Sequence, residues 1–563
     1  MYDLLPLFVP FAPLAAALFL AQSALRRRTR GPAAAVASGA MLVALVLALF
    51  SLLLAVAAGP WTLSTWTWLT LGSIEVRFGL VMDHLTGVML VLVSSVSLIV
   101  HLYARRYMQD EGGYRRFYAL LSGTTAVTLA MVMAADLIQL FLLWQLMGVL
   151  LYLLLGFDLS SRRAADSAAW SLLINRAGDL AFALGVLLLV QAYGTSDIAS
   201  LFERAAADPQ HFALSWLGLP GARLDANATA TLLIFVGAMA RSAQFPLHVW
   251  LPNTMDAPTP VSALMHAGLV NAGGFLLNRL APLYMEAPTT LHVVFVVGTV
   301  TALIGSTIML TQTDVKRALG YSTVGQMGYM MMEVGLGAFA LAIFHLAAHG
   351  IFKATLFLSA GGVVNATRRN PNTEPETVSG GPPRLPLWVG LATTLGVPLL
   401  ILVGVHEMLG ISLPEHQGAI VLLFFGWVTA SQAALSVYRA GARNSVNATL
   451  LMLATLFVVV FGYMWGGHAF EAFLYPEGVG GLARVAIDWT LFYIAIALAA
   501  ALILLGWLTA FRRVEGAGSG RPTARGYDQA YVWVHGGLFV EGLYRRLILR
   551  PAVALAGLVD RYL

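Results

Sequence analysis

The sequence contains no cysteine among its 563 residues. Disulfide bonds, thiolate zinc sites and iron–sulfur clusters are therefore excluded from this chain. Any redox or zinc chemistry connected with it must belong to a partner subunit. We expect no cofactor and no metal in the chain itself.

Charged residues are also scarce, at 11% of the chain, whereas soluble globular proteins carry about 25%. Hydrophobic residues make up 59%, and the mean hydropathy is +0.78. This composition excludes a soluble globule and predicts a polytopic membrane protein. The formal net charge of +5 is modest for the length and gives no support to nucleic-acid binding.

Apolar stretches of about 20 residues, the length that crosses a bilayer as a helix, recur along the whole chain. The first lacks a preceding basic region and is too long for a signal-peptide core, so we expect it to be retained. Residues 60–83 alternate in a β-like pattern and predict a small external hairpin. We count fifteen spans, near residues 4–25, 33–58, 84–104, 116–134, 136–157, 167–193, 229–246, 260–283, 291–312, 318–338, 339–364, 386–410, 418–438, 446–466 and 485–511.

Basic clusters fall on alternate loops between these spans, and the other loops carry mostly acids. By the positive-inside rule the N-terminus is outside and the C-terminus is inside. A basic amphipathic tail ends the chain, and two interpretations of it stay open: it lies on the anionic inner leaflet, or it docks a cytoplasmic partner. The basic clusters are at 26–30, 105–116, 162–163, 316–317, 368–369, 439–443 and 512–513.

Residues 250–274 place prolines, glycines, an aspartate and a histidine inside apolar sequence. Proline removes a backbone donor and disfavours helix in the residue before it, and glycine weakens the helix that resumes. Backbone freed in this way is tolerated in a membrane only where it is buried in protein or lines a watery cavity. The segment therefore predicts a broken helix and indicates ion transport. The helix-breaking residues are Pro246, Pro252, Pro258, Pro260, Gly273 and Gly274.

His345, His349 and Lys353 recur every fourth residue and so share one face of a helix. A charge at the bilayer centre costs roughly 2.5–3.5 kcal/mol on insertion scales, so each needs a partner or a water path. Three roles are open for these residues: proton transfer, a structural pair and zinc binding. Leu346 stands where a zinc-protease motif has glutamate, and no third ligand is evident. We therefore predict ion translocation by this stripe.

Four further ionisable residues lie in or near the first half of the predicted bundle. Asp179 and Arg176 indicate a buried ion pair, structural or functional. Arg241 precedes the break, and because arginine keeps its proton it can only act as a fixed charge or hold carbonyls of the broken helix. His266 lies in the broken helix, where an imidazole that titrates near neutral pH suits a switch between half-channels.

Weaker candidates follow. His406 and Glu407 form a titratable pair near the end of the twelfth span and are added to the ion-translocation set. Glu333 is expected to reach the membrane interface. Gln145 can hydrogen-bond across helices but cannot carry a proton charge. We therefore expect it to leave a gap in any chain of proton-carrying side chains.

An ordered set of motifs resembles the antiporter-like, proton-pumping subunits of respiratory complex I and the Mrp antiporters. The resemblance implies two inverted five-helix repeats, each with a broken helix, and a polar axis along the membrane midplane. We divide the chain accordingly into 1–110, 111–285 (first repeat), 286–440 (second repeat), 441–511 and a cytoplasmic linker and tail, 512–563. The motifs are Arg176–Asp179, Ser242–Pro246, Trp250–Pro252, Pro258–Ala263 with His266, Gln312–Arg317, Tyr321–Thr323, Phe344–His345, His349 and Phe352–Ala354.

The chain departs from that family at charged positions. Gln145 stands where the family usually has glutamate, Arg241 where it has lysine, and residues 405–407 where it has a further lysine. Residues 265–279 resemble instead the membrane (DabB-like) subunit of inorganic-carbon accumulation complexes. That resemblance implies the bacterial inner membrane and a large cytoplasmic DabA-like partner, zinc-binding and similar to β-carbonic anhydrase.

These observations favour a transport subunit, not an enzyme, that conducts protons or sodium ions and couples their gradient to CO2 hydration and bicarbonate accumulation by its partner. The alternative is a proton-pumping subunit of a respiratory or hydrogenase-type oxidoreductase. A third possibility is a stand-alone cation/proton antiporter. Copurifying proteins separate the first two, because a large zinc protein without flavin favours carbon uptake.

Overall fold

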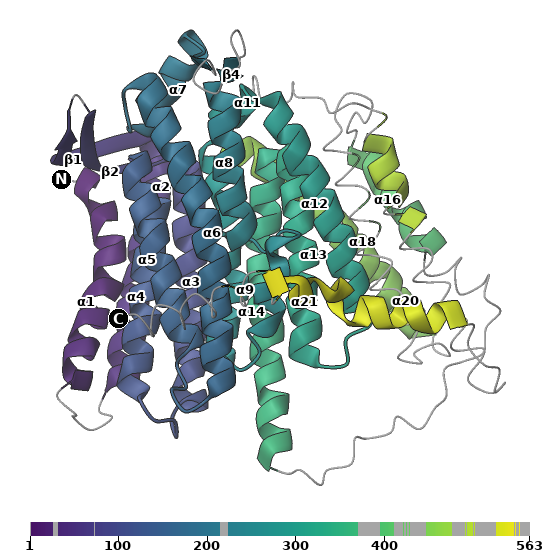
Figure 1. The fold of residues 1–563 in the computed structure, drawn as a ribbon. Helices are drawn as coiled ribbons and strands as arrows, with labels where there is room; N and C mark the ends of the chain where they lie inside the picture. Colours follow the sequence, from purple (N-terminus) through teal and green to yellow (C-terminus); the bar gives the residue numbers. More distant parts are fainter. Residues whose placement is uncertain are drawn as a thin grey trace.

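The computed structural model describes residues 2–25, 32–72, 74–213, 223–369, 395–409, 446–475, 490, 492–498, 500–501 and 525–544, with isolated positions at 420, 424, 427, 546, 547 and 551. Long helices stand side by side, and the strands, with the short helices labelled α7 and α11, lie toward one end of the bundle (Figure 1). The all-α membrane fold is thus confirmed. The long helices are α1 (Phe8–Leu25), α2 (Ala33–Ala58), α3 (His84–Tyr107), α4 (Tyr114–Val132), α5 (Leu137–Leu155), α6 (Arg162–Tyr193), α8 (Ala226–Arg241), α12 (Pro288–Met309), α13 (Val315–Gly335), α14 (Phe339–Arg369), α16 (Val397–Leu409) and α18 (Val446–Leu474).

Nine helical segments within the described ranges are long and apolar enough to cross a membrane. The predicted spans 418–438 and 485–511 lie largely outside the described residues, as do several of the basic loops. The count of fifteen spans, the domain boundaries and the orientation of the termini therefore stay predictions. The shorter elements are η1 (Tyr2–Leu7), α7 (Ile198–Ala207), α11 (Ala281–Met285), α20 (Arg525–His535), η7 (Gly537–Phe539), α21 (Val540–Tyr544), β3 (His211–Ala213) and β4 (Arg223–Asp225).

The hairpin expected between the second and third spans is present. Strands β1 (Trp61–Leu71) and β2 (Ile74–Met82) pair antiparallel, with register shifts at two points. Because alternate side chains of a strand point to opposite faces, the alternating sequence forms strands here and not a helix. That the hairpin is external stays a prediction.

The predicted helix break is confirmed. After α8 the chain forms η3 (Leu247–Asn253), α9 (Thr259–Ala267), η4 (Leu269–Asn271) and α10 (Ala272–Arg279). Pro258 and Pro260 lie at the start of α9, where a missing backbone donor is tolerated. The segment Thr259–Arg279 is almost wholly buried.

Side chains satisfy the backbone groups that the break sets free. Trp250 Nε1 donates to the Ala240 carbonyl at 2.9 Å, and Ser242 Oγ donates to the Val270 carbonyl at 2.6 Å. Thr301 Oγ1 accepts from the Phe245 amide at 2.9 Å. Irregular backbone at membrane depth is stable only with such partners, so the polar residues in this segment hold the break in place.

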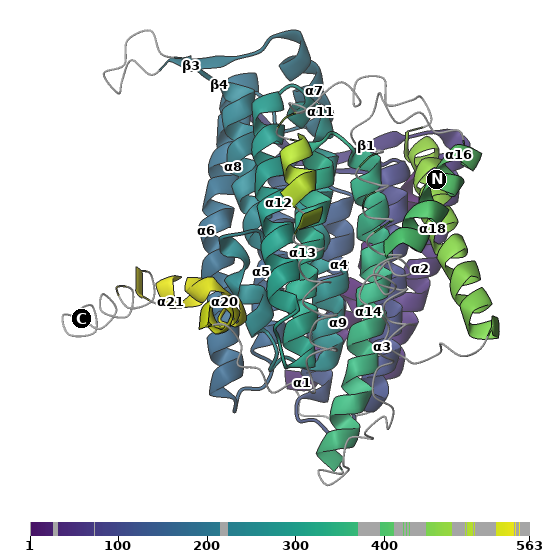
Figure 2. The same ribbon diagram turned by 90° about the vertical axis from the view of Figure 1, so that its right-hand side faces the viewer.

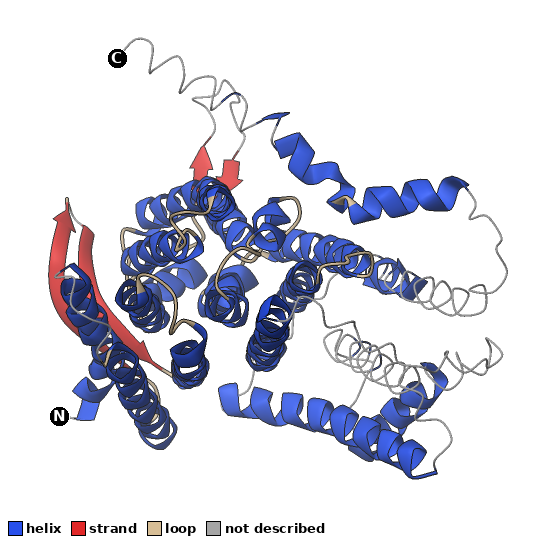
Figure 3. Ribbon diagram, turned by 90° about the horizontal axis from the view of Figure 1, so that it is seen from below, coloured by secondary structure: helices blue, strands red, loops and turns tan. Residues whose placement is uncertain are grey.

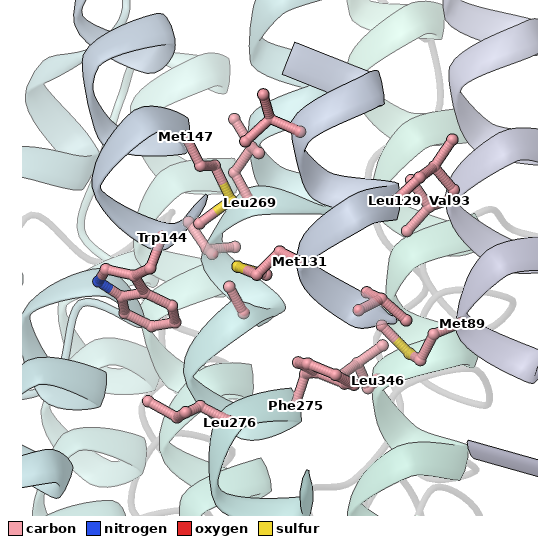
Figure 4. Close-up of a cluster of buried hydrophobic side chains, with 14 of the residues drawn as sticks. Met89, Val93, Leu129, Met131, Trp144, Met147, Leu269, Phe275, Leu276 and Leu346 are labelled. Atoms are coloured by element: carbon pink, nitrogen blue, oxygen red, sulfur yellow. The ribbon is translucent and has the colours of Figure 1, made fainter. Parts of the chain in front are cut away.

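Apolar side chains pack around the break, from α3, α4, α5 and α14 (Figure 4). Helices α12 and α13 pack on each other through glycines. A Cβ at Gly298 would lie 2.5 Å from the Met332 amide nitrogen, and one at Gly305 would lie 2.5 Å from the Gly325 amide nitrogen. The two backbones therefore touch along this seam, as small residues allow in membrane helices.

The segment α20–η7–α21 lies beside the bundle, across the long helices (Figures 2 and 3). His535 Nδ1 lies 2.9 Å from the Thr311 carbonyl oxygen, and Gln312 Nε2 donates to the His535 carbonyl at 3.2 Å. Asn253, at the end of η3, donates to Glu541 at 3.2 Å. The described part of the predicted tail is thus fixed to the α12–α13 connection and to the break.

Candidate ion-translocation site

A first charged cluster joins α5, α6 and α8. Asp179 accepts a 2.6 Å hydrogen bond from Trp144 Nε1 and pairs with Arg176 Nη2 at 2.8 Å. Arg241 Nη2 lies 3.7 Å from the same carboxylate, and its guanidinium lies over the Trp144 ring at 4.9 Å. The predicted Asp179–Arg176 ion pair is confirmed.

Arg241 is completely buried, and it donates to the Trp144 carbonyl at 3.3 Å instead of to the broken helix. The structural role predicted for Arg241, that of holding carbonyls of the broken helix, is therefore wrong, and its role as a fixed charge stays a prediction. Gln145 also belongs to this cluster, because its Oε1 accepts a hydrogen bond from Arg176 Nη1. The absence of a side chain at Gly148 lets both guanidinium groups approach the α5 backbone, since a Cβ there would lie 2.6 Å from Arg176 Nη2 and 2.9 Å from Arg241 Nη2.

A second cluster joins the last turn of α13 to α14. His345 Nδ1 lies 3.1 Å from both carboxylate oxygens of Glu333, and His345 Nε2 lies 2.8 Å from Gln326 Oε1. Glu333 has no solvent exposure. Glu333 is thus enclosed by protein, and its place at the membrane interface stays a prediction. Its contact with His345 was not predicted from the sequence. The sequence offered one signal, an acid twelve residues before a histidine across a short turn.

His349 and Lys353 continue this cluster along α14. The rings of His345 and His349 have centroids 6.3 Å apart, and neither ring nitrogen of His349 has a hydrogen-bond partner among the described residues. Lys353 is fully buried, with Nζ 3.5 Å from the Leu319 carbonyl. The predicted stripe thus lies inside the protein.

His266 approaches the stripe from the broken helix. Its Nδ1 lies 3.1 Å from Thr323 Oγ1, and its ring stacks on Phe357 at 4.2 Å. Phe357 lies on α14 one turn after Lys353, so the stacked ring places His266 beside the stripe. The structure therefore brings four predicted residues, from two elements 80 residues apart in sequence, into one group.

This group extends along the axis of α13. Lys316 lies in the first turn of α13 and Glu333 in the last, about 26 Å apart along the helix axis, whereas the hydrocarbon core is about 30 Å thick. Lys316 donates to the Met255 carbonyl at 3.2 Å, beside the break. Ionisable groups from Lys316 through the α14 stripe to Glu333 therefore follow α13 over a length close to the thickness of a hydrocarbon core.

A small cavity lies beside the break, between α3, α4 and α14. Its walls are mainly apolar and include Met131, Phe275 and Leu346, while Thr125 and Asn271 contribute polar atoms. The Oδ1 atom of Asn271 is buried and has no partner among the described residues. Figure 4 shows the apolar side chains that surround this region.

The remaining two predicted residues, His406 and Glu407, belong to α16. Glu407 is exposed on α16, and the side chain of His406 lies outside the described residues. Within the described ranges no three histidine, aspartate or glutamate side chains are grouped as a metal site would need. The roles assigned to His406, Glu407 and the other candidates stay predictions.

Two family models match the chain. The NADH:quinone oxidoreductase/Mrp antiporter transmembrane family covers residues 134–431, and the N-terminal family of complex I chain 5 covers residues 68–118. The first match contains the break and both clusters.

Related sequences fall in two groups. The chain is 42% identical over 521 residues to the probable inorganic carbon transporter subunit DabB1 of Halothiobacillus neapolitanus, and the alignment covers 89% of each chain. It is 38% identical over 391 residues to the NAD(P)H-quinone oxidoreductase chain 5 of a Synechocystis species, covering 66% of this chain and 55% of that one.

Solved structures share the fold. A chain of the membrane-bound sulfane sulfur reductase, an archaeal respiratory membrane complex, superposes with a TM-score of 0.57 at 19% identity, over 91% of this chain and 97% of that one. A chain of the Mrp complex from a Dietzia species superposes with a TM-score of 0.55 at 25% identity, over 98% of this chain and 59% of that one.

Proposed function

Because the chain belongs to the NADH:quinone oxidoreductase/Mrp antiporter family of multi-pass membrane proteins, and within it to the DabB-like subunits, we propose that it conducts cations to drive inorganic carbon accumulation. The ion gradient is coupled to CO2 hydration by a cytoplasmic zinc subunit, DabA-like and similar to carbonic anhydrase. The chain itself supplies the ion path and no catalytic group.

The observation that carries this proposal is the line of ionisable side chains along α13 and α14. Imidazoles titrate near neutral pH, and a buried lysine or glutamate can take up or release a proton, so His345, His349 and Lys353 suit a relay. Arginine holds its proton, so Arg176 and Arg241 supply fixed charge to the first cluster instead.

The energy available fits the proposed task. One elementary charge moving through 100 mV releases roughly 2.3 kcal/mol, which shifts an equilibrium by about 50-fold. Such a shift is enough to drive hydration strongly toward bicarbonate. Transport measurements with protons or sodium ions as the only gradient identify the ion and the direction of flow.

An oxidoreductase subunit is the second candidate, and the matches to chain 5 of quinone oxidoreductases support it. The glutamine at 145 and the arginine at 241 favour the carbon-uptake branch. Purification from the native membrane distinguishes them, since a large zinc protein favours carbon uptake and a quinone-reducing complex favours respiration.

Replacing both His345 and Lys353 with alanine tests the ion path. We expect uptake of labelled inorganic carbon, in cells that depend on this chain and its partner, to fall at least about tenfold while the membrane level of the chain is unchanged. His211→Ala is the matched control, because His211 is exposed on β3. Uptake that survives the double substitution would remove the α13–α14 line from the mechanism.

A further inference from the structure

The first cluster carries an excess positive charge. Arg176 and Arg241 face the single carboxylate of Asp179, and these are the charged groups that meet there among the described residues. Since an arginine cannot become neutral by releasing its proton, one positive charge remains in the cluster. An uncompensated buried charge is costly, so the cluster needs a further anion.

The same place has donors without acceptors. Arg241 Nε and Nη1, Arg176 Nε and Gln145 Nε2 are buried and have no hydrogen-bond partner among the described residues. Arg241 has no solvent exposure at all. Because buried polar atoms are nearly always bonded in native proteins, these N–H groups indicate a ligand that accepts hydrogen bonds.

We propose that Arg176, Arg241 and the amide of Gln145 bind a small monovalent oxyanion, bicarbonate in the cell. One negative charge neutralises the cluster, whereas a divalent anion would leave it with a net negative charge. The cluster therefore favours a monovalent anion. The planar guanidinium fork matches the geometry of an O–C–O group. The side chain of Arg176 is 35% exposed, so the site is open on that side.

The choice of bicarbonate rests on the proposed function, in which it is the product of the partner subunit. The anion site itself rests only on the charge count and the unpartnered donors. Binding of accumulated bicarbonate is then transmitted to the helices of the ion path, because α8, which carries Arg241, leads directly into the break.

Thermal unfolding of the full chain alone, held in lipid nanodiscs, measures this binding, because the partner of the proposed function would itself bind bicarbonate. At matched ionic strength, we expect bicarbonate and formate to raise the unfolding midpoint saturably by about 1–3 °C relative to gluconate. Gln145→Glu places a carboxylate in the cluster, so this variant should no longer respond. Arg176→Gln removes the excess charge and should lose the response as well.

Gln109→Glu is the matched control, because it adds the same charge at an exposed position and should respond like the unsubstituted chain. A midpoint that ignores bicarbonate and formate, or an equal response in the Gln145→Glu variant, overturns the proposal. A response to chloride but not to formate would show that the bound anion is not an oxyanion. Labelled-carbon uptake, measured in parallel, separates failure of this site from failure of the proposed function.

Discussion

At the scale of single residues, the two clusters differ in whether their cationic side chains can release a proton. Both cations of the first cluster are arginines, whereas the second contains a carboxylate, two imidazoles and an amine. His345 Nδ1 lies at hydrogen-bond distance from the Glu333 carboxylate inside the protein, so a proton added to one residue changes the charge that the other faces. The ion movement that we propose therefore belongs to the second cluster.

Glu333→Gln tests this assignment. The amide keeps the size of the side chain but removes the charge that stabilises a protonated His345, so we expect carbon uptake to fall at least about tenfold. The measurement is labelled-carbon uptake at equal membrane level. Glu203→Gln, on an exposed position of α7, should leave uptake unchanged. Full uptake by the Glu333 variant would show that His345 needs no charged partner.

At the scale of elements, the glycine seam between α12 and α13 positions the second cluster. Gly298 meets the Met332 amide, directly before Glu333. Any side chain at this point pushes the end of α13 away from α12. The distance between Glu333 and His345 therefore depends on residues that carry no charge.

Gly298→Ala is expected to destabilise the protein by about 1–3 kcal/mol, because the added Cβ contacts backbone that cannot rotate away. Thermal unfolding in detergent measures the change. Gly39→Ala, on α2, is the control, since a Cβ there has no neighbour within 4 Å. Equal midpoints for the two variants would contradict the close packing.

At the scale of the whole molecule, one ion pair ties the broken helix to the N-terminal helices. Arg279, at the end of α10, donates to Asp83 at 2.6 Å and to Thr86 at 2.6 Å. Asp83 also caps α3 by accepting from the Thr86 amide at 2.7 Å. Burial raises the pKa of Asp83, but the charge and hydrogen bonds of Arg279, with those of Thr86, outweigh it and leave the pKa below its ordinary value.

This lowered pKa makes stability depend on pH in the acid range. The pair contributes fully above the ordinary aspartate value of 3.8, and the contribution is lost as pH falls through the lower folded value. We expect Asp83→Asn to cost about 2–3 kcal/mol at neutral pH and to reduce the acid-side loss. Unfolding midpoints between about pH 3 and 7 measure both effects. An unchanged pH profile would contradict the role of the pair.

Much of this architecture follows from the sequence. Hydropathy predicted the spans, the prolines predicted the break, and the four-residue spacing predicted the shared face of His345, His349 and Lys353. Glu333 and Gln326 were missed as partners of His345, because their contact depends on how α13 is held against α14. The sequence showed that Gln145 cannot carry a proton. Its hydrogen bond to Arg176 could not be predicted, because it depends on how α5 packs on α6.

The glycine seam also limits how the molecule can change shape. Helices whose backbones touch cannot slide past each other without lifting apart, so α12 and α13 move as one rigid body. Any change of shape beside the second cluster is therefore expected in α14 and the α9–α10 segment, not within the α12–α13 pair. A cross-link between α12 and α13 should leave transport intact, whereas one between α9 and α14 should stop it.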